Sequence, residues 1–342
     1  MKNKVLTGLL LVLIGGWGSL SAQSAGSNYS RQVNTLIGTK GVGLTSGYLY
    51  PGATYPYGMV QFTPSYFSKR SGFVINQLSG GGCEHMGNFP TFPVKGKLKM
   101  SPDNILNYRI NISEEKGHAG YYEAMVQEDI KAKLTVTERT GMASYEYPAD
   151  QQYGTVIIGG GISATPIEQA AIVITAPNKC EGYAEGGNFC GLRTPYKVYF
   201  VAEFDTDALE SGTWKRNELK PNTTFAEGEY SGVYFTFDVN KKKNIQYKIG
   251  VSYVSVENAR ENLKAENTGW DFLQIQNQAE SKWNHYLGKI EVEGTNPDRT
   301  TQFYTHLYRS FIHPNVCSDV NGEYMGADFK VHKSRSKHYT SF

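Results

Sequence analysis

Hydrophobic and polar residues are spaced differently in the two parts of the chain. From about residue 29 to 256, short apolar runs recur between turn residues, and several of them alternate apolar with polar positions. Such alternation is typical of strands with one face on a core. The runs are GTVIIGG, AAIVITA, KVYFVAEF, GVYFTFDV, QYKIGVSYVSV and AKLTVTERTGMASYEY. Many strands at close intervals predict a mainly β fold, a large two-sheet antiparallel sandwich.

The spacing becomes helical after this region. WDFLQIQNQAESKWNHYLGKI predicts a linker helix near 268–287, and RTTQFYTHLYRSFIHPNV predicts a second helix near 297–313, ended by Pro314. The remaining segment is predicted to be loop and turn. Two helices cannot bury their apolar stripes by themselves. Either this tail packs onto the sandwich, or the chain is the front part of a longer protein.

The first residues have the features of a secretory signal peptide, which we place at 1–24. Lys2 and Lys4 precede an apolar run at 5–14, and small residues follow it. The run is too short to span a bilayer, and no cysteine follows it for lipid attachment. The sequence therefore predicts a periplasmic or secreted protein without a membrane anchor.

Composition and charge narrow the function only slightly. The 342 residues include 34 Lys and Arg against 32 Asp and Glu, a net charge of +2. No basic run is dense enough to follow a nucleic-acid backbone, and KKKN at 241–244 is interpreted as a solvated turn. The 24 Tyr, 16 Phe and 37 Gly suit β-structure and carbohydrate-facing surfaces, but they also suit sandwiches without that function.

Four cysteines could form disulfides in an exported protein. Cys180 and Cys190 bracket EGYAEGGNF, which we interpret as a glycine-rich turn, and a hairpin-closing bridge between them is predicted. Cys83 and Cys317 are too far apart in sequence to assign. No C-x-x-C or H-x-x-x-H spacing indicates zinc.

Long ordered motifs identify a family resemblance. YPGATYPYGMVQFTPSY at 50–66 combines proline, glycine and aromatic residues and predicts a rigid loop that leads into the strand MVQF. This stretch resembles glycoside hydrolase family 92, the calcium-dependent exo-α-mannosidases. So do VNTLIGTKG, LSGGGCEHMGN at 78–88 and FYTHLYRSFIHPNVCSDVNGEYMGAD at 303–328. The resemblance covers essentially the whole mature chain.

The resemblance implies a domain organisation. It predicts a β-supersandwich at 25–260, a helical linker at 261–296, and at 297–342 the truncated start, with the first helix, of an (α/α)6 catalytic toroid.

In the family, substrate binds between sandwich and toroid, which implies substrate-binding roles for Gly52, Cys83, Glu84 and His85. Gly52 would let the backbone approach a sugar, and Glu84 and His85 would hydrogen-bond the hydroxyls of the leaving-group sugar. Alternatively, Gly52 lies in a tight turn beside the core, and Glu84 and His85 bind each other or solvent. TPSYFSKRSGFVI lacks the tryptophan that some members carry as a sugar platform. A preference for α-1,2-linked mannose is therefore not implied.

The family's inverting mechanism needs an acid and a base, and these residues and the calcium ligands lie in the toroid. We therefore assign no catalytic residue and no metal ligand here, and calcium is expected only in the complete family enzyme. Other acids are interpreted as solvated loop carboxylates: Glu114, Glu115, Glu138, Glu181 and Glu185. The late histidines and aspartates are interpreted as a helix end and a turn rather than a metal site: His306, His313, Asp319 and Asp328.

The predicted function is the N-terminal portion of a secreted exo-α-mannosidase-like glycoside hydrolase. It would act on α-mannose-containing glycans, with a missing C-terminal catalytic domain as partner, and it is expected to be inactive as this truncated chain. The alternative is a non-catalytic periplasmic carbohydrate-binding β-sandwich module. An interaction domain with no role in sugar binding is a third possibility.

Overall fold

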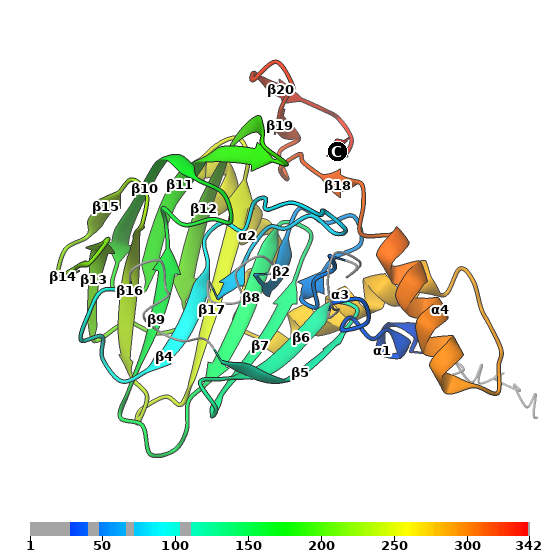
Figure 1. Cartoon of the computed structure of the whole chain (residues 1–342), viewed down its shortest axis with the longest axis horizontal. Helices are drawn as coiled ribbons and strands as arrows, with labels where there is room; N and C mark the ends of the chain where they lie inside the picture. The colour runs from blue at the N-terminus through cyan, green and yellow to red at the C-terminus, as the bar shows by residue number, and fades with distance from the viewer. Residues whose placement is uncertain (1–27, 40–47, 66–71, 103–110, 341–342) are drawn as a thin grey trace, which may run out of the picture.

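Two antiparallel sheets packed face to face form most of the molecule (Figure 1). The computed structural model describes residues 28–39, 48–65, 72–102 and 111–340, so the predicted signal peptide at 1–24 lies outside the described residues. Among these residues, the first sheet has eight strands. Their order is β1 (Ala53–Thr54), β2 (Gln61–Pro64), β3 (Phe73–Val74), β4 (Thr91–Lys95), β9 (Tyr153–Gly159), β16 (Ser231–Asp238), β13 (Glu210–Lys215) and β14 (Glu218–Pro221).

The second sheet has nine strands within the described ranges. Their order is β15 (Phe225–Glu227), β10 (Ile167–Ala176), β11 (Lys179–Phe189), β12 (Leu192–Phe204), β17 (Asn244–Ser252), β8 (Thr140–Glu146), β7 (Ile130–Val136), β6 (Tyr121–Val126) and β5 (Ile112–His118). The apolar runs of the sequence correspond to β7 to β10, β12, β16 and β17. The prediction of a mainly β, two-sheet antiparallel sandwich is therefore confirmed.

The core lies between the two sheets because their facing residues alternate with solvent-facing ones. In β6, for example, Tyr122, Ala124 and Val126 are buried, and the residues between them are only partly buried. Aromatic rings from both sheets meet in the core, where the ring centroids of Phe204 and Phe235 lie 5.0 Å apart. This alternation orients strands such as β6, since a shift of one residue would expose its apolar set, whereas β8, β9 and β16 are buried along nearly their whole length.

In the part of the chain that the structure describes, the helices are α1 (Tyr29–Gln32), α2 (Val256–Glu266), α3 (Phe272–Leu287) and α4 (Pro297–Ser310). Both predicted helices are present, as α3 and α4. Asp271 caps α3 through the Gln274 amide, and α4 begins with Pro297 after the capping residue Asn296.

Helix α2 was not predicted by the hydrophobic spacing. The last strand of the sandwich ends at Ser252, so helical structure begins at Val256, before the expected boundary at residue 260. Its buried residues are Asn258, Ala259, Asn262 and Leu263. Because half of that face is asparagine, the sequence shows no apolar stripe with helical period.

The rigid aromatic loop at 50–57 is the joint between the sandwich and the helices. The indole Nε1 of Trp283 donates a hydrogen bond of 2.7 Å to the carbonyl oxygen of Thr54. The hydroxyls of Thr54 and Tyr308 lie 2.7 Å apart, and the rings of Trp283 and Tyr308 lie 4.5 Å apart between centroids. The tail therefore packs onto the sandwich. This was one of the two ways in which its helices could bury their apolar stripes.

A second apolar core forms around this joint, separate from the one between the sheets. Arg309 of α4 also spans it, donating to the carbonyl oxygens of Tyr50 (3.1 Å) and Thr35 (2.7 Å). The fully buried members are Val33, Tyr50, Ala119, Trp283, Leu287, Tyr304, Tyr308 and Ile312.

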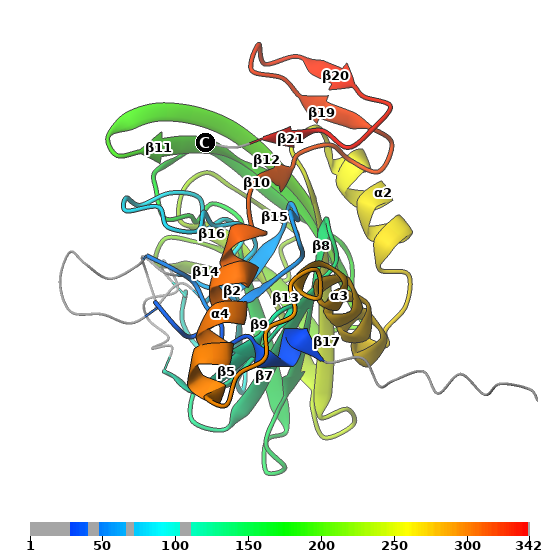
Figure 2. The ribbon, with the colours of Figure 1, turned by 90° about the vertical axis from the view of Figure 1, so that its right-hand side faces the viewer.

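The segment after α4 contains short strands where loop and turn were expected. β18 (Asn315–Val316) pairs with β21 (Tyr339–Thr340), and β19 (Glu323–Met325) pairs with β20 (Val331–Lys333). The β19–β20 hairpin stands above the sandwich, near α2 and the long hairpin of β11 and β12 (Figure 2).

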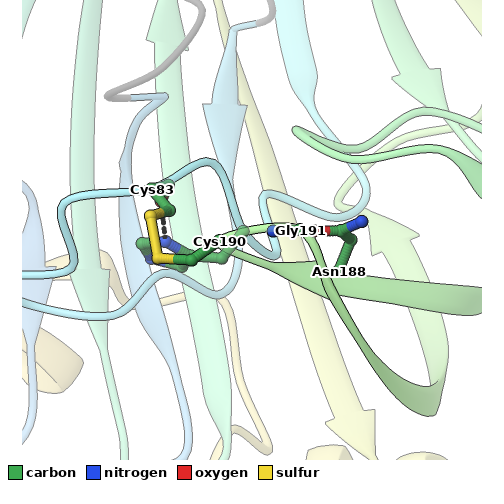
Figure 3. Close-up of a disulfide and its surroundings, with 5 residues drawn as sticks. Cys83, Asn188, Cys190 and Gly191 are labelled. Atoms are coloured by element: carbon green, nitrogen blue, oxygen red, sulfur yellow. Dashed lines mark hydrogen bonds between the residues drawn. A yellow bond between two sulfur atoms is a disulfide. The ribbon is translucent and has the colours of Figure 1, made fainter.

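The predicted bridge between Cys180 and Cys190 is wrong. The disulfide joins Cys83 to Cys190, with their Cα atoms 5.2 Å apart (Figure 3), whereas Cys180 and Cys317 are free. EGYAEGGNF is not a turn but the strand β11, and its two flanking cysteines lie at opposite ends. Ten residues of strand extend about 33 Å, and a disulfide needs Cα atoms within about 7 Å. Cys180 is instead buried in the core, where burial raises the pKa of its thiol.

The true turn between β11 and β12 consists of Cys190 and Gly191. Phe189 pairs with Leu192, and both central residues have positive φ, 52° and 82°. Two residues of this conformation make the type I′ hairpin turn that suits twisted strands. Cys190 is therefore placed at a hairpin tip, where it can reach another loop.

Replacing Tyr308 with Phe should destabilise the joint. The variant leaves the buried Thr54 hydroxyl without its partner at a site from which water is excluded, and we expect a loss of about 1–3 kcal/mol in the free energy of unfolding. Denaturant unfolding of both proteins measures it. Tyr199→Phe, on the outer face of β12, is the control and should change stability by less than about 0.5 kcal/mol. Equal effects of the two substitutions would contradict a structural role for the joint.

Non-reducing peptide mapping of the oxidised protein should recover one peptide pair, linked through Cys83 and Cys190. The bridge spans 107 residues of sequence. In the chain-entropy model such a loop stabilises by about 4–5 kcal/mol, so the double variant Cys83→Ser/Cys190→Ser should lose much of its unfolding free energy. Cys317→Ser serves as the matched control and should lose far less. A recovered Cys180–Cys190 pair would refute the assignment.

Candidate functional site

A cavity of about 590 Å³ lies where three segments distant in sequence converge. They are the loop at 78–86, the end of the β11–β12 hairpin, and the segment at 315–340. The lining residues are Met59, Gln61, Leu78, His85, Met86, Glu185, Asn188, Phe189, Thr194, Pro195, Tyr196, Lys197, Tyr253, Asn315, Val316, Cys317, Met325, Gly326, Ala327, Phe329 and Thr340. Its volume is in the range of small-molecule sites.

The loop at 78–86 is closed by His85 and tethered by the disulfide. Nε2 of His85 accepts a hydrogen bond of 2.8 Å from the Leu78 amide, and Nδ1 lies 2.6 Å from the carbonyl oxygen of Cys83. The amide must donate to Nε2, so Nδ1 carries the proton in this arrangement. Cys83 links the loop to Cys190 at the hairpin tip (Figure 3).

The environment of His85 keeps its imidazole neutral. The residue is 3% exposed, and burial lowers the pKa of the ring, against the smaller opposing effects of its backbone hydrogen bonds to Cys83 and Leu78. The ring of Phe189 meets it edge-on, with centroids 5.8 Å apart. Both nitrogens are engaged, so His85 organises the loop and offers little hydrogen bonding to a ligand.

The β11–β12 hairpin contributes an ion pair and an aromatic wall. Nζ of Lys197 lies 3.3 Å from Oε2 of Glu185, its cross-strand partner, and 4.0 Å from the ring centroid of Tyr183. The hydroxyl of Tyr196 donates a 2.6 Å hydrogen bond to Oδ1 of Asn88. These contacts fix polar groups that line the cavity or support its wall.

The segment at 315–340 forms the third wall of the cavity. It is held in place by Arg139, a buried residue of the β7–β8 turn. Its Nε donates to the carbonyl oxygen of Ser318 at 2.7 Å, and its Nη1 lies 2.6 Å from carboxylate oxygens of both Glu138 and Glu266. One arginine thus ties together the sandwich, the end of α2 and the start of the last segment. Removing one partner from such a buried cluster leaves uncompensated charge.

Asp319 docks the same segment on α2. Its carboxylate accepts hydrogen bonds from Ser252 (2.7 Å), Asn258 (2.8 Å) and Asn262 (2.6 Å). The residue is 2% exposed, and burial raises the pKa of its carboxyl although these bonds oppose the shift. The asparagines of α2 are therefore a polar socket for Asp319.

The predicted substrate-binding residues do not form one cluster. Gly52 is buried against β2, where an added Cβ would lie 2.2 Å from the Cβ of Thr63, so its lack of a side chain has a packing reason. Glu84 is exposed, and the lining residues include neither it nor Gly52. His85 lines the cavity directly, and Cys83 supports it through the disulfide. Residue Tyr55 of the aromatic loop lines a different, open groove of about 770 Å³ along α3.

The interpretation of the acids as solvated loop carboxylates is partly wrong, since several are paired in strands or turns. Glu181 lies 2.6 Å from Arg260, and Glu115 accepts from the hydroxyl of Tyr122. Glu138 belongs to the Arg139 cluster, and only Glu114 is fully exposed among the five. Among the residues lining the cavity, Glu185 is the one carboxylate.

The structure shows no cluster of metal ligands in the part of the chain that it describes. No group of three or more His, Cys, Asp or Glu side chains there is placed to hold a metal ion. His313 instead accepts a hydrogen bond from the Ser79 amide, and Asp328 pairs with His332 at 2.9 Å. Asp319 does begin a turn, since its carbonyl oxygen accepts from the Gly322 amide, but its carboxylate binds Ser252, Asn258 and Asn262 rather than local amides.

The hairpin wall and the polar socket were not found by sequence reasoning. Along β11, the inward positions Cys180, Gly182, Ala184 and Gly186 are small, and the outward ones are larger. This alternation was a usable signal for a strand, but glycines conceal it. The convergence of the three segments had no local signal at all.

Within the described ranges, no helix is both long and apolar enough to cross a membrane.

Comparison with solved structures shows the same fold. A family GH92 α-mannosidase from Bacteroides thetaiotaomicron matches with a TM-score of 0.80 and 24% identity, covering 92% of this chain and 45% of that chain. The GH92 family glycosyl hydrolase ccman5 matches with a TM-score of 0.82 and 23% identity, over the same shares of the two chains. This chain therefore spans less than half the length of these proteins.

Sequence comparison agrees. An uncharacterized secreted glycosidase from Arthroderma benhamiae is 26% identical over an alignment of 334 residues, which covers 86% of this chain and 42% of that protein. The model of the glycosyl hydrolase family 92 N-terminal domain matches residues 32–252, and that of the family 92 catalytic domain matches residues 258–342. The chain thus belongs to glycosyl hydrolase family 92.

Proposed function

We propose that this chain is the sandwich domain and the first part of the catalytic domain of a secreted glycosidase that hydrolyses α-mannosides with inversion. Three similar proteins support the substrate and mechanism: an α-mannosidase solved with mannoimidazole, an inverting mannosidase, and a secreted glycosidase. The sandwich and the segment at 315–340 enclose the cavity, and together they form one wall of the substrate site. Residues 1–24 direct export to the periplasm or the medium.

The observation that carries the division of labour is the single carboxylate of the cavity. Inverting hydrolysis needs two carboxyl groups about 6.5–9.5 Å apart, one to protonate the leaving oxygen and one to activate water. Glu185 is the one carboxylate among the residues that line the cavity, and its Oε2 lies 3.3 Å from Nζ of Lys197. One carboxylate cannot supply both groups, so the acid–base pair is completed by residues of the catalytic domain.

Calcium is part of the proposed activity only for the complete enzyme. The described residues give no sign of a calcium site, because no three His, Cys, Asp or Glu side chains among them are placed to hold one ion. We therefore assign to this chain only what its own side chains do. They shape the cavity and hold its loops in place.

The competing function is a carbohydrate-binding sandwich without catalysis. The ordered docking of α3, α4 and the last segment favours the hydrolase part, since these elements extend the sandwich toward a catalytic domain rather than closing it. The nucleotide sequence that follows codon 342 distinguishes the two functions. An in-frame or frameshifted continuation with a Trp-Asp motif supports the hydrolase, and its absence supports the module.

The purified chain, residues 25–342, should not turn over an aryl α-mannoside, with or without added calcium. General acid–base groups contribute about 10²–10⁴-fold each to such reactions, and the cavity supplies one carboxylate at most. The measurement is release of the aryl alcohol over hours, with a complete family 92 α-mannosidase as the positive control.

Calcium-dependent turnover by the chain would contradict this assignment of roles. In that case Glu185→Gln and Glu84→Gln identify the carboxylate responsible, with Glu114→Gln, an exposed residue of β5, as the matched control.

A further inference from the structure

The beginning of the loop at 78–86 is held by two histidines from different parts of the chain. The amide of Leu78 donates a hydrogen bond of 2.8 Å to Nε2 of His85, and the next amide, that of Ser79, donates one of 3.3 Å to Nε2 of His313. His313 follows α4, so the second bond connects the loop to the helical part of the molecule. In both bonds the imidazole is the acceptor, because a backbone N–H can only donate.

An imidazole can accept at Nε2 only while it is neutral. A protonated ring carries a hydrogen on both nitrogens, so its Nε2 would face the backbone amide as a second donor. Nδ1 of His85 lies 2.6 Å from the carbonyl oxygen of Cys83, a partner that suits the one proton of the neutral ring. Uptake of a further proton therefore turns each of the two bonds into a contact between donors.

The surroundings of both rings favour the neutral form. Burial lowers the pKa of His85 and of His313 from the ordinary value of 6.5, against smaller opposing effects of hydrogen bonds. The loop in its bonded form therefore holds fewer protons than a released loop, whose histidines titrate in water. It follows that closure is strongest at neutral pH and weakens as the pH falls below the ordinary pKa of histidine.

The pKa shifts of the two rings do not come from charged neighbours. Within the loop, Glu84 is exposed to solvent. Glu185 and Lys197 of the hairpin are paired with each other, and the guanidinium of Arg309 on α4 is bound to backbone carbonyl oxygens. Other titratable side chains on the surrounding elements are Tyr48, Tyr57, Tyr196, Tyr253, Cys317 and His338.

The disulfide limits how much of the loop can move. Cys83 stays linked to Cys190 at the hairpin tip, so loss of the two histidine bonds frees the residues before it (Figure 3). Gly80, the first of three successive glycines, has a φ of 79°, and an added Cβ there would meet no heavy atom within 4 Å. Its amide donates to the carbonyl oxygen of Tyr48 at 3.0 Å, a bond that does not titrate. Leu78 lines the cavity, so movement of this segment changes the cavity wall.

We propose that residues 78–82 are an acid-sensitive flap on the cavity, held closed by His85 and His313 in their neutral forms and released when these rings are protonated. Acidification loosens the cavity wall and leaves the sandwich intact. The proposal concerns a conformational equilibrium, so it does not depend on the proposed hydrolysis.

Hydrogen exchange of the intact chain between about pH 7 and pH 5, read by mass spectrometry and corrected for intrinsic exchange rates, tests the proposal. Protection of the flap should fall with pH by up to about tenfold per pH unit for each titrating histidine, the limit set by uptake of one proton. A peptide from β8, in the core of the sandwich, should keep its protection over the same range.

Variants assign the effect to the two rings. In His85→Gln/His313→Gln the amide oxygens can still accept from the backbone but do not titrate, so the pH dependence of the flap should disappear. His306→Gln, at an exposed residue of α4, is the matched control and should retain the pH dependence. Nitrogen NMR of the unmodified chain gives an independent readout: at neutral pH both rings should carry their proton on Nδ1.

Several results would overturn the flap. They are constant protection of residues 78–82 on acidification, a loss of protection shared equally by the β8 peptide, and a loss that persists in the folded double variant. If the double variant does not fold, the NMR measurement decides, and a proton on Nε2 of either ring at neutral pH would refute its role as an acceptor.

Discussion

The hydrogen bond from the indole of Trp283 to the carbonyl oxygen of Thr54 is the contact on which the arrangement of the molecule depends. It joins the first strand of one sheet to α3, and the adjoining hydroxyl pair of Thr54 and Tyr308 joins the same strand to α4. The rigidity of the aromatic loop has its purpose here. Prolines and a glycine packed against Thr63 preset the loop conformation, so that little entropy is lost when the helices dock.

The joint also determines where the chain goes next. The amide of Tyr57 donates to the carbonyl oxygen of Phe311 at the end of α4, and the carbonyl oxygen of Tyr57 accepts from the Val316 amide. The chain is thereby directed from the helix to the cavity. Arg139 and the polar socket on α2 then hold it there through Ser318 and Asp319. The cavity exists because these contacts bring the last segment over the hairpin.

Stability and function make different demands on the polar atoms of this region. His85, Gln61 and Asn315 line the cavity, yet each is occupied in holding a loop. Such groups stabilise the architecture because burying them without partners would be costly. The same engagement leaves these three side chains little capacity to bind a ligand. In this chain the sandwich shapes the cavity and contributes Glu185, the one carboxylate among the residues that line it.

The sequence by itself determined the elements whose burial follows a simple period. Strands such as β7 and β10 and helices α3 and α4 were recognisable because one face of each is apolar, and the family resemblance agreed with the arrangement. Helix α2 was not recognisable, because its buried face is built from Asn258 and Asn262, whose partner Asp319 lies some sixty residues away. Strand β11 was mistaken for a turn because its inward residues are small, and the wrong disulfide followed from that. Only the tertiary structure decided the pairing of Cys83 with Cys190, the engagement of His85 and the existence of the cavity. Each depends on distances between segments remote in sequence, which no local pattern of side chains specifies.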